Sequence, residues 1–280
     1  MIRLVAIDLD GTLLDTRWRV PEANRQAIAR AIERGVHVVL VTGRRFDFTR
    51  PVIARLPAAI GLIVNNGALI KSSDGATLLR RLLPARIARA VLASTLQFHA
   101  SAALVFDRPA TSQVVFERID WEDPVRRGYF ERNREYLAEI SPIEDALTED
   151  PIQLMYTGAV ADMRRLVATL RALDFAADFS VAVAEYEARS FTIVDVIERN
   201  CSKASALGEW AKRLGVEREQ ILAIGDNLND REMLEFAGLA MVMDNAVPEL
   251  KSLGWPVTLS NDDCGVAAAI ERYVLGNGNP

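Results

Sequence analysis

Short runs of consecutive apolar residues recur along the chain, and each run ends abruptly in polar residues or glycine. The runs cover residues 4–7, 36–41, 62–64, 221–224 and 239–243. Unbroken apolar runs of this length are typical of parallel strands that are buried on both faces. The pattern therefore predicts a buried sheet whose strands come from both ends of the chain.

Amphipathic segments separate these runs. Residues 21–34 repeat alanine and isoleucine at helical spacing, with Pro21 at the start and Gly35 as a stop. Residues 207–214 and 231–237 have a similar helical pattern ahead of the two later runs. The alternation predicts an α/β fold, with a doubly wound, mainly parallel Rossmann-like sheet and helices on both of its faces.

The pattern changes in the middle of the chain. Residues 84–197 contain helix-like and strand-like segments in no regular alternation, which indicates an inserted α+β domain. We therefore expect residues 1–83 and 198–280 to form one core domain. The pair Asp74-Gly75, between apolar residues, predicts a hairpin turn in the core just before the insertion.

A charged aromatic stretch lies within the insertion, at residues 121–136. It carries Arg126, Arg127 and Arg132. These arginines are candidate ligand contacts, although such a stretch is more typical of a solvated helix face.

Composition excludes several classes of function. The 280 residues are 50% hydrophobic and carry a formal net charge of −5, which fits a globular protein and gives no global positive field for nucleic acid. We expect no export signal, because the first apolar stretch, residues 4–7, is short and is followed by aspartates. We expect no membrane span, because no apolar stretch reaches the ~18 uninterrupted residues that a span needs. Cys201 and Cys264 are expected to be free thiols in the cytoplasm.

Polar residues follow four of the predicted strands. They are Asp8 to Thr12, Thr42 to Arg44, Asn65 to Gly67, and Gly225 to Asp230. Since parallel strands deliver their carboxyl ends to one edge of a sheet, these groups should converge where α/β proteins bind ligands.

Three aspartates in that crevice, Asp8, Asp10 and Asp226, would repel one another unless a cation lay between them. A ligand set made only of oxygen favours Mg²⁺ over zinc. The only two histidines, His37 and His99, lie in apolar surroundings in the sequence, and we interpret both as structural.

Lys203 is a candidate counter-charge, because the chain has only four lysines among its 33 basic residues. It follows Ser202 at the start of a predicted helix, where the helix N-terminus favours anions. A compact ammonium can sit between a carboxylate and a phosphoryl oxygen as a point charge.

These motifs resemble those of the haloacid dehalogenase-like superfamily, and specifically of the Cof-type phosphatases with a type IIB cap. Residues 8–13 (DLDGTL) resemble motif I, residues 42–44 (TGR) motif II, Lys203 motif III and residues 225–230 (GDNLND) motif IV, while residues 66–68 are similar to a segment frequent in the Cof group. The resemblance spans the whole chain. Around Lys203, Cys201-Ser202 and Ala204 stand where the family often has glycine.

The resemblance implies a mechanism. Asp8 would be the nucleophile, and Asp10 would protonate the leaving group and then activate water. Mg²⁺ would be held by Asp8, by the main-chain carbonyl of Asp10 and by Asp226. The phosphoryl oxygens would be bound by Leu9, Thr42, Gly43, Lys203 and Asn229. The supporting residues would be Asp230, Asn66 and Arg44, with Asp230 orienting Lys203 or a metal-bound water.

The implied function is hydrolysis of small phosphomonoesters, such as sugar phosphates or similar metabolites, through an aspartyl phosphate. The inserted domain would act as a cap that selects the substrate. Two alternatives remain open at this point: a sugar phosphomutase of the same superfamily, and a non-enzymatic phosphoacceptor signalling domain. We expect a monomer or a homodimer, with no nucleic-acid or membrane partner.

Overall fold

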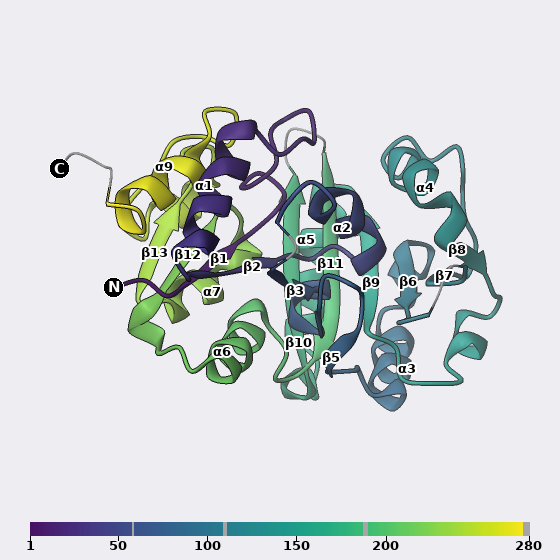
Figure 1. Cartoon of the computed structure of the whole chain (residues 1–280). Coiled ribbons are helices and arrows are strands. Elements are labelled where there is room, and N and C mark those ends of the chain that lie inside the picture. Colours follow the sequence, from purple (N-terminus) through teal and green to yellow (C-terminus); the bar gives the residue numbers. More distant parts are fainter. Residues whose placement is uncertain (58, 109–110, 187–189, 277–280) are drawn as a thin grey trace. The chain divides into compact units, whose positions relative to one another are not determined.

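The computed structural model describes residues 1–57, 59–108, 111–186 and 190–276. The chain forms two compact units, which are described separately (Figure 1). The first unit contains residues 1–80 and 202–280, and the second contains residues 81–201. The insertion expected from the sequence, residues 84–197, lies within the second unit.

Within the described residues, the first unit contains a seven-stranded sheet in the order β13-β12-β1-β2-β3-β4-β5. Its strands are β1 (Leu4–Ile7), β2 (His37–Val41), β3 (Ile60–Val64), β4 (Leu69–Lys71), β5 (Thr77–Arg80), β12 (Ile221–Gly225) and β13 (Leu239–Val242). The strands from β13 to β3 are parallel. Strand β4 pairs antiparallel with β3 and with β5. Strands β4 and β5 form a hairpin whose turn contains Gly75 with φ +94°, so the predicted turn is confirmed.

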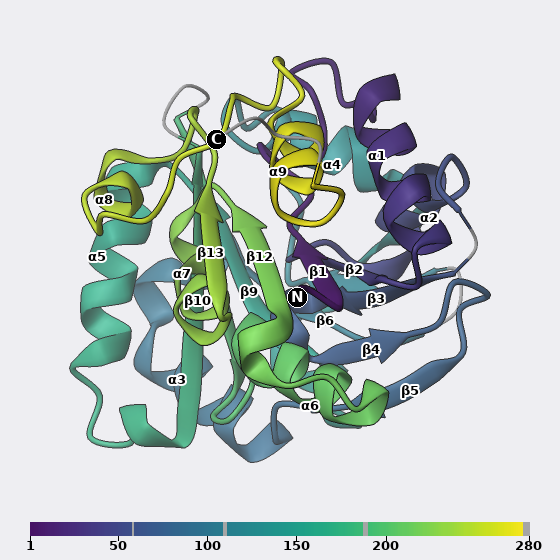
Figure 2. The ribbon, with the colours of Figure 1, turned by 60° about the vertical axis from the view of Figure 1, so that its left-hand side comes forward.

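Helices pack on both faces of this sheet (Figure 2). They are α1 (Glu22–Glu33), α2 (Phe46–Ile53), α6 (Lys203–Leu214), α7 (Arg231–Phe236), α8 (Pro248–Lys251) and α9 (Gly265–Tyr273). Helices α1 and α9, from opposite ends of the chain, lie side by side, and the Asn24 side chain accepts a hydrogen bond from the Ala267 N–H. Helix α6 ends at Gly215 in the left-handed conformation that glycine favours. The predicted α/β class is confirmed.

Two features of the first unit differ from expectation. Helix α2 was not predicted from the sequence, because it contains Pro51 and proline usually ends a helix. His37 is exposed at the first position of β2, although the sequence placed it inside a buried strand. It precedes the buried part of the strand, where a polar ring can remain in water.

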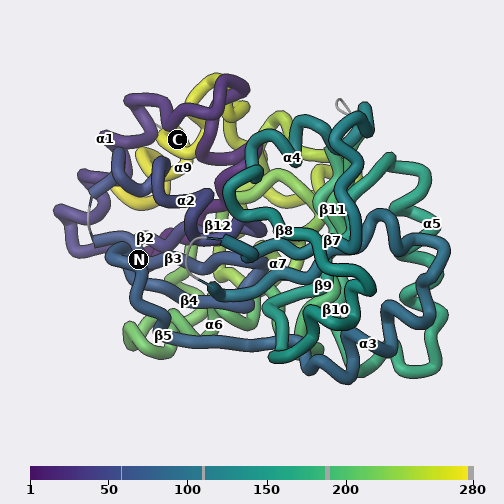
Figure 3. The backbone as a smooth tube through the Cα atoms, turned by 90° about the vertical axis from the view of Figure 1, so that its right-hand side faces the viewer, coloured from purple at the N-terminus to yellow at the C-terminus, as the bar shows by residue number. Residues whose placement is uncertain are grey.

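The second unit contains, within the described residues, a six-stranded sheet in the order β10-β11-β9-β6-β7-β8 (Figure 3). Its strands are β6 (Ala102–Val105), β7 (Val114–Phe116), β8 (Leu137–Glu139), β9 (Gln153–Gly158), β10 (Phe179–Tyr186) and β11 (Phe191–Glu198). Its helices are α3 (Ala85–Ser94), α4 (Arg127–Asn133) and α5 (Val160–Arg171). All neighbouring strands pair antiparallel except β7 and β8.

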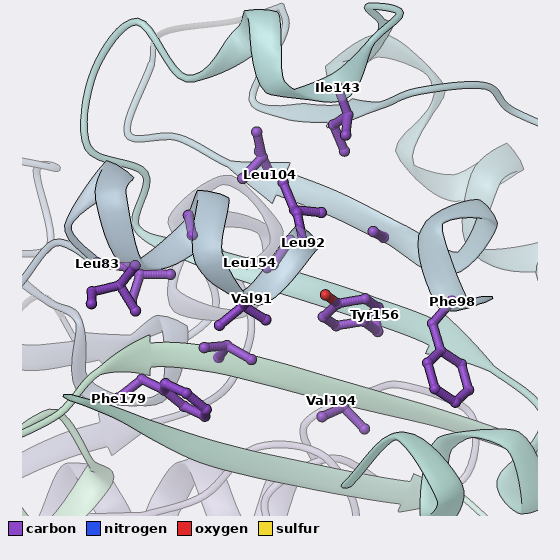
Figure 4. Packing of buried hydrophobic residues seen from close by; sticks show 14 of the residues in the cluster. Leu83, Val91, Leu92, Phe98, Leu104, Ile143, Leu154, Tyr156, Phe179 and Val194 are labelled. Atoms are coloured by element: carbon purple, nitrogen blue, oxygen red, sulfur yellow. The ribbon is translucent and has the colours of Figure 1, made fainter. Parts of the chain in front are cut away.

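A hydrophobic cluster between this sheet and helices α3 and α5 forms the core of the second unit (Figure 4). Alternate residues of the strands supply it, including Leu104, Leu154 and Val194. Tyr156 is fully buried in the cluster, and its hydroxyl lies 2.7 Å from that of Thr95. Burial raises the pKa of Tyr156 above its ordinary range, so the phenol is neutral.

The charged aromatic stretch contains one buried arginine, contrary to the expected solvated face. Arg126 is 8% exposed, pairs with Asp123 at 2.8 Å and donates to the carbonyl of Ala100. Arg127 conforms to expectation, because it is exposed and pairs with Glu131 one helical turn away. Across the described parts of the chain, every helix is too short or too polar to cross a lipid bilayer.

Candidate active site

The parallel strands of the first unit deliver polar residues to one edge. Strand β1 lies between β2 and β12, so Asp8, which follows it, lies at the middle of that edge. The Asp8 N–H donates to the carbonyl of Ile224 at 3.0 Å, and the Thr42 N–H donates to the carbonyl of Ile63 at 2.9 Å. These bonds extend the sheet ladder and fix the backbone of both residues.

Lys203 joins two aspartates that are far apart in the sequence. Its Nζ donates to Oδ1 of Asp8 and to Oδ1 of Asp230, each at 2.6 Å. The Lys203 side chain is 1% exposed, and both carboxylates are buried. Charged groups of this kind persist in an interior only when they are paired and hydrogen-bonded.

The start of helix α6 holds Lys203 in place. Ser202 and Ser205 form a reciprocal capping box, which satisfies the first N–H groups of the helix. Gly67, after β3, approaches so closely that a Cβ there would lie 2.2 Å from the Ser202 carbonyl oxygen. The Ser202 side chain thus caps the start of helix α6 in the segment around Lys203, where the family pattern often has glycine.

Asp226 and Asp230 have different partners. One oxygen of Asp226 accepts a hydrogen bond from the Thr12 hydroxyl at 2.8 Å. Asp230 Oδ2 accepts from the N–H groups of Asp226 and Asn227, at 3.0 Å each, while its other oxygen binds Lys203. Asp230 thus ties the loop after β12 to the lysine.

Burial and mutual repulsion perturb these groups. Burial, with the nearby charge of Asp230, raises the pKa of Asp8 to about 7. Burial and the charge of Asp8 raise the pKa of Asp226 well above its ordinary value. Burial lowers the pKa of Lys203, but Asp230 and Asp8 outweigh it and raise the pKa overall. The lysine is therefore charged, whereas the environment of Asp8 and Asp226 disfavours two uncompensated negative charges and favours a proton or a cation there.

The acidic cluster fits a divalent cation. One carboxylate oxygen each from Asp8, Asp226 and Asp230 lies within 4.8 Å of the others, and all three residues are buried. Among the described residues this is the one group with such a geometry. Because Lys203 supplies a single positive charge, a hard cation would relieve the remaining repulsion.

The carboxylate of Asp10 belongs to a different contact. Arg44 binds it with both arms of the guanidinium, at 2.7 Å and 2.6 Å. Both side chains are mostly buried. Two parallel hydrogen bonds of this kind fix the orientation of a carboxylate as well as its position.

The remaining predicted residues lie on the same edge. Asn229 donates to Asn66 Oδ1 at 3.3 Å, and a Cβ on Gly43 would lie 3.0 Å from that oxygen. Leu9 is buried, and its carbonyl accepts from two N–H groups of the turn after β1. Neither Cys201 nor Cys264 forms a disulfide, and Cys201 is buried.

Thr12 was not assigned a role from the sequence. It is buried, and its hydroxyl fixes Asp226. Gly11, next to it, has φ +83°, and a Cβ there would lie 2.2 Å from Asp226 Oδ2. The polar segment after β1 is the one sequence signal for this contact, whose partner comes from 214 residues away.

A family profile described as haloacid dehalogenase-like hydrolase matches residues 5–270. The chain belongs to this family. The resemblance drawn from the motifs is therefore confirmed, and the protein is an enzyme of the phosphatase type.

The relatives include enzymes that are named for a particular substrate. An HMP-PP phosphatase from Serratia proteamaculans is 30% identical over 90% of this chain and 88% of its own length. A 5-amino-6-(5-phospho-D-ribitylamino)uracil phosphatase from Bacillus subtilis is 30% identical over 98% of this chain and 96% of its own length. A haloacid dehalogenase-like hydrolase structure from B. subtilis superposes with a TM-score of 0.82 at 25% identity, covering 97% of this chain and all of that one.

Proposed function

We propose that the protein is a Mg²⁺-dependent phosphatase that hydrolyses small phosphomonoesters through an aspartyl phosphate on Asp8. The observation that carries this proposal is the buried ion cluster, in which Lys203 lies 2.6 Å from both Asp8 and Asp230. Asp226 adds a further carboxylate beside them. Such concentrated charge suits phosphoryl transfer, where catalysis consists of positioning and electrostatic stabilisation.

In the first half-reaction, an Asp8 carboxylate oxygen attacks phosphorus. The bond from phosphorus to the ester oxygen breaks, and its electron pair stays on the leaving oxygen. Asp10 transfers its carboxyl proton to that oxygen, so an alcohol leaves and Asp8 carries the phosphoryl group.

In the second half-reaction, the Asp10 carboxylate accepts a proton from water as the water oxygen attacks phosphorus. The bond between phosphorus and Asp8 breaks, which releases inorganic phosphate and restores both aspartates. The Arg44 guanidinium contacts both Asp10 oxygens and so fixes the orientation of the carboxyl group that serves in both half-reactions.

Mg²⁺, held by Asp8, Asp226 and the main-chain carbonyl of Asp10, would offset the repulsion between the carboxylates and the phosphate. Lys203, Thr42, Asn229 and the N–H groups of Leu9 and Gly43 would bind the phosphoryl oxygens. Asp230 supports this set, because it binds Lys203 and the backbone of the loop after β12.

We assign substrate selection to the inserted unit, residues 81–201, as a cap, and chemistry to the core. The chain's relatives include enzymes named for phosphorylated metabolites, which supports a small phosphorylated metabolite as the substrate. The protein would act as a monomer or homodimer in the cytoplasm.

Release of free phosphate from a panel of sugar phosphates, nucleotides, polyol phosphates and phosphorylated cofactors tests the proposal. We expect continuous release with Mg²⁺ and none with EDTA or after Asp8→Asn. The exposed Asp244, replaced by asparagine, is the matched control. Transfer of phosphate within the sugar would indicate a mutase, and a single turnover a phosphoacceptor domain.

A further inference from the structure

Trp18 lies against the arginine that binds Asp10. The guanidinium carbon of Arg44 is 4.8 Å from the centre of the Trp18 ring. The same guanidinium forms the two short hydrogen bonds to the Asp10 carboxylate. Tryptophan, arginine and aspartate therefore form one continuous contact within the first unit.

The loop that presents Trp18 is fixed by hydrogen bonds. The Asp15 carboxylate accepts from the N–H groups of Arg17 and Arg19, and it pairs with the Arg19 side chain at 2.9 Å. The Trp18 N–H donates to the Asp15 carbonyl at 2.9 Å. The loop thus holds its tryptophan in a defined place.

Trp18 also has two costly features. Its φ is +61°, in the left-handed region that a bulky side chain rarely adopts. The residue remains 46% exposed, so burial of its ring compensates the strain only in part. Strain of this kind at the edge of a site is evidence for a functional constraint.

Arginine benefits from such a platform. Its long side chain has many rotamers, and a planar guanidinium stacks well on an aromatic face. With one face on Trp18 and two N–H groups on Asp10, Arg44 has both its plane and its position restricted. The orientation of the Asp10 carboxyl then depends on Trp18, which does not touch it directly.

We propose that Trp18 is a positioning residue, which holds Arg44 and through it aims the Asp10 carboxyl at the leaving oxygen. The inference rests on the proposed function, in which Asp10 transfers the proton to that oxygen. Misplacing a proton donor slows the departure of a poor leaving group more than that of a good one, because only the poor one depends on the proton. Substrate binding by the rest of the site is unaffected.

Two aryl esters of similar shape test the proposal: p-nitrophenyl phosphate, with a good leaving group, and phenyl phosphate, with a poor one. We expect Trp18→Ala to lower kcat on phenyl phosphate about tenfold or more and on p-nitrophenyl phosphate less than about threefold. KM should change little for either. Trp18→Phe, which keeps an aromatic face, should restore most of the loss. Trp255→Ala, at a half-buried tryptophan elsewhere in the same unit, is the matched control.

A second variant tests the path through the arginine. Arg44→Lys keeps the charge but removes the planar fork, so it should reproduce the selective loss on phenyl phosphate. Adding Trp18→Ala to Arg44→Lys should then change the ratio of the two rates by less than about twofold, because both changes disable one contact. Independent, multiplying effects would overturn the proposal, as would equal losses on both esters or no loss at all.

Failure of the proposed function gives a different result. The wild-type protein would then release no phosphate from either ester with Mg²⁺ present, whatever residue stands at position 18. A second result would remove only the inference about Trp18 and leave the proposed function in place. In that case Asp8→Asn abolishes the activity of the wild type, but Trp18→Ala leaves the preference between the two esters unchanged.

Discussion

Two buried polar groups, one in each unit, differ in charge: the acidic cluster of the core unit, and a hydroxyl pair in the hydrophobic cluster of the inserted unit. In the core unit, Lys203 pairs with Asp8 and Asp230, and Asp226 lies beside these carboxylates, so three acidic side chains are grouped with one lysine. In the inserted unit, the hydroxyl of Tyr156 contacts that of Thr95 at 2.7 Å inside a hydrophobic cluster, and neither group is charged.

The difference separates chemistry from packing. A neutral hydroxyl pair completes a core at small cost, because each hydroxyl has a partner. An excess of buried charge costs stability and persists where it prepares a site for a charged ligand. The pKa values of Asp8 and Asp226 are raised for the same reason, since burial and neighbouring charge disfavour their ionised forms. We therefore expect substitutions in the cluster to change activity first, and substitutions in the inserted core to change stability first.

Asp8→Asn should have the largest effect. Turnover should fall at least about a thousandfold, or about 4 kcal/mol on the barrier, since an amide is a poor nucleophile and a poor metal ligand. The melting temperature without metal should stay the same or rise, because the variant removes one of the repelling carboxylates. Phosphate release and calorimetry measure the two effects.

The contrast between the charged site and the inserted core requires that Asp8→Asn lower the activity without lowering the melting temperature. A variant that lost activity and also melted well below the wild type would show that Asp8 serves stability. Steady turnover by a verified Asp8→Asn protein would exclude a covalent aspartyl phosphate.

Lys203→Arg comes next. The wide guanidinium fork cannot occupy a buried site built for a point charge between two carboxylates, so we expect activity to fall more than about tenfold although the charge is kept. Lys212→Arg, at an exposed position of the same helix, is the matched control and should change nothing. Activity within about threefold of wild type would show that the site around Lys203 accommodates a guanidinium and is not built for a point charge.

The convergence of polar residues at one edge of the core sheet could be predicted from the sequence, because each strand and its polar residues have a local signal. The apolar runs that become β1, β2, β3 and β12 are short and uninterrupted, and each is followed directly by its polar residues. Since parallel strands share an edge, local patterns were enough to bring Asp8 and Asp226 together. The chemistry of the cluster then follows from its residue types.

Other contacts have no local signal. Thr12 meets Asp226, and Trp18 meets Arg44, only through the folded structure. The buried Arg126 looks like a surface residue in the sequence, because its partner Asp123 is near in the chain, as on a solvated helix, and its distant partner, the Ala100 carbonyl, is a main-chain group. Helix α2 forms despite Pro51, so tertiary packing outweighs local propensity there.

The pH dependence of the metal-free protein should follow from Asp8. Its pKa is about 7 when folded, against an ordinary value of 3.8, so between these values the folded state binds the extra proton. Proton binding by Asp8 therefore adds to the free energy of unfolding, on the order of a few kcal/mol, below about pH 4. This stabilisation is lost as the pH rises through 7.

Thermal unfolding in EDTA between pH 4 and pH 8 measures this contribution as the difference between wild type and Asp8→Asn. The variant should gain stability relative to wild type as the pH rises. Mg²⁺ added at pH 7 should raise the melting temperature of wild type more than that of the variant. If the difference in stability between wild type and Asp8→Asn did not vary with pH, the pKa of Asp8 would not be raised by its surroundings.

Tyr156→Phe should have the smallest effect, and it tests the other side of the contrast. The change removes one buried hydroxyl, while the Thr95 hydroxyl keeps its hydrogen bond to the Val91 carbonyl at 2.8 Å. We expect a loss of ~1 kcal/mol in the free energy of unfolding, because no buried group is left without a partner. The value of kcat should stay within about twofold of wild type, since the ring still fills its place in the cluster. Urea unfolding and phosphate release measure both quantities, with Tyr273→Phe, in helix α9 of the core unit, as the control. A large loss of activity at unchanged stability would show that the buried hydroxyl pair takes part in function, and the division between charged site and neutral core would be wrong.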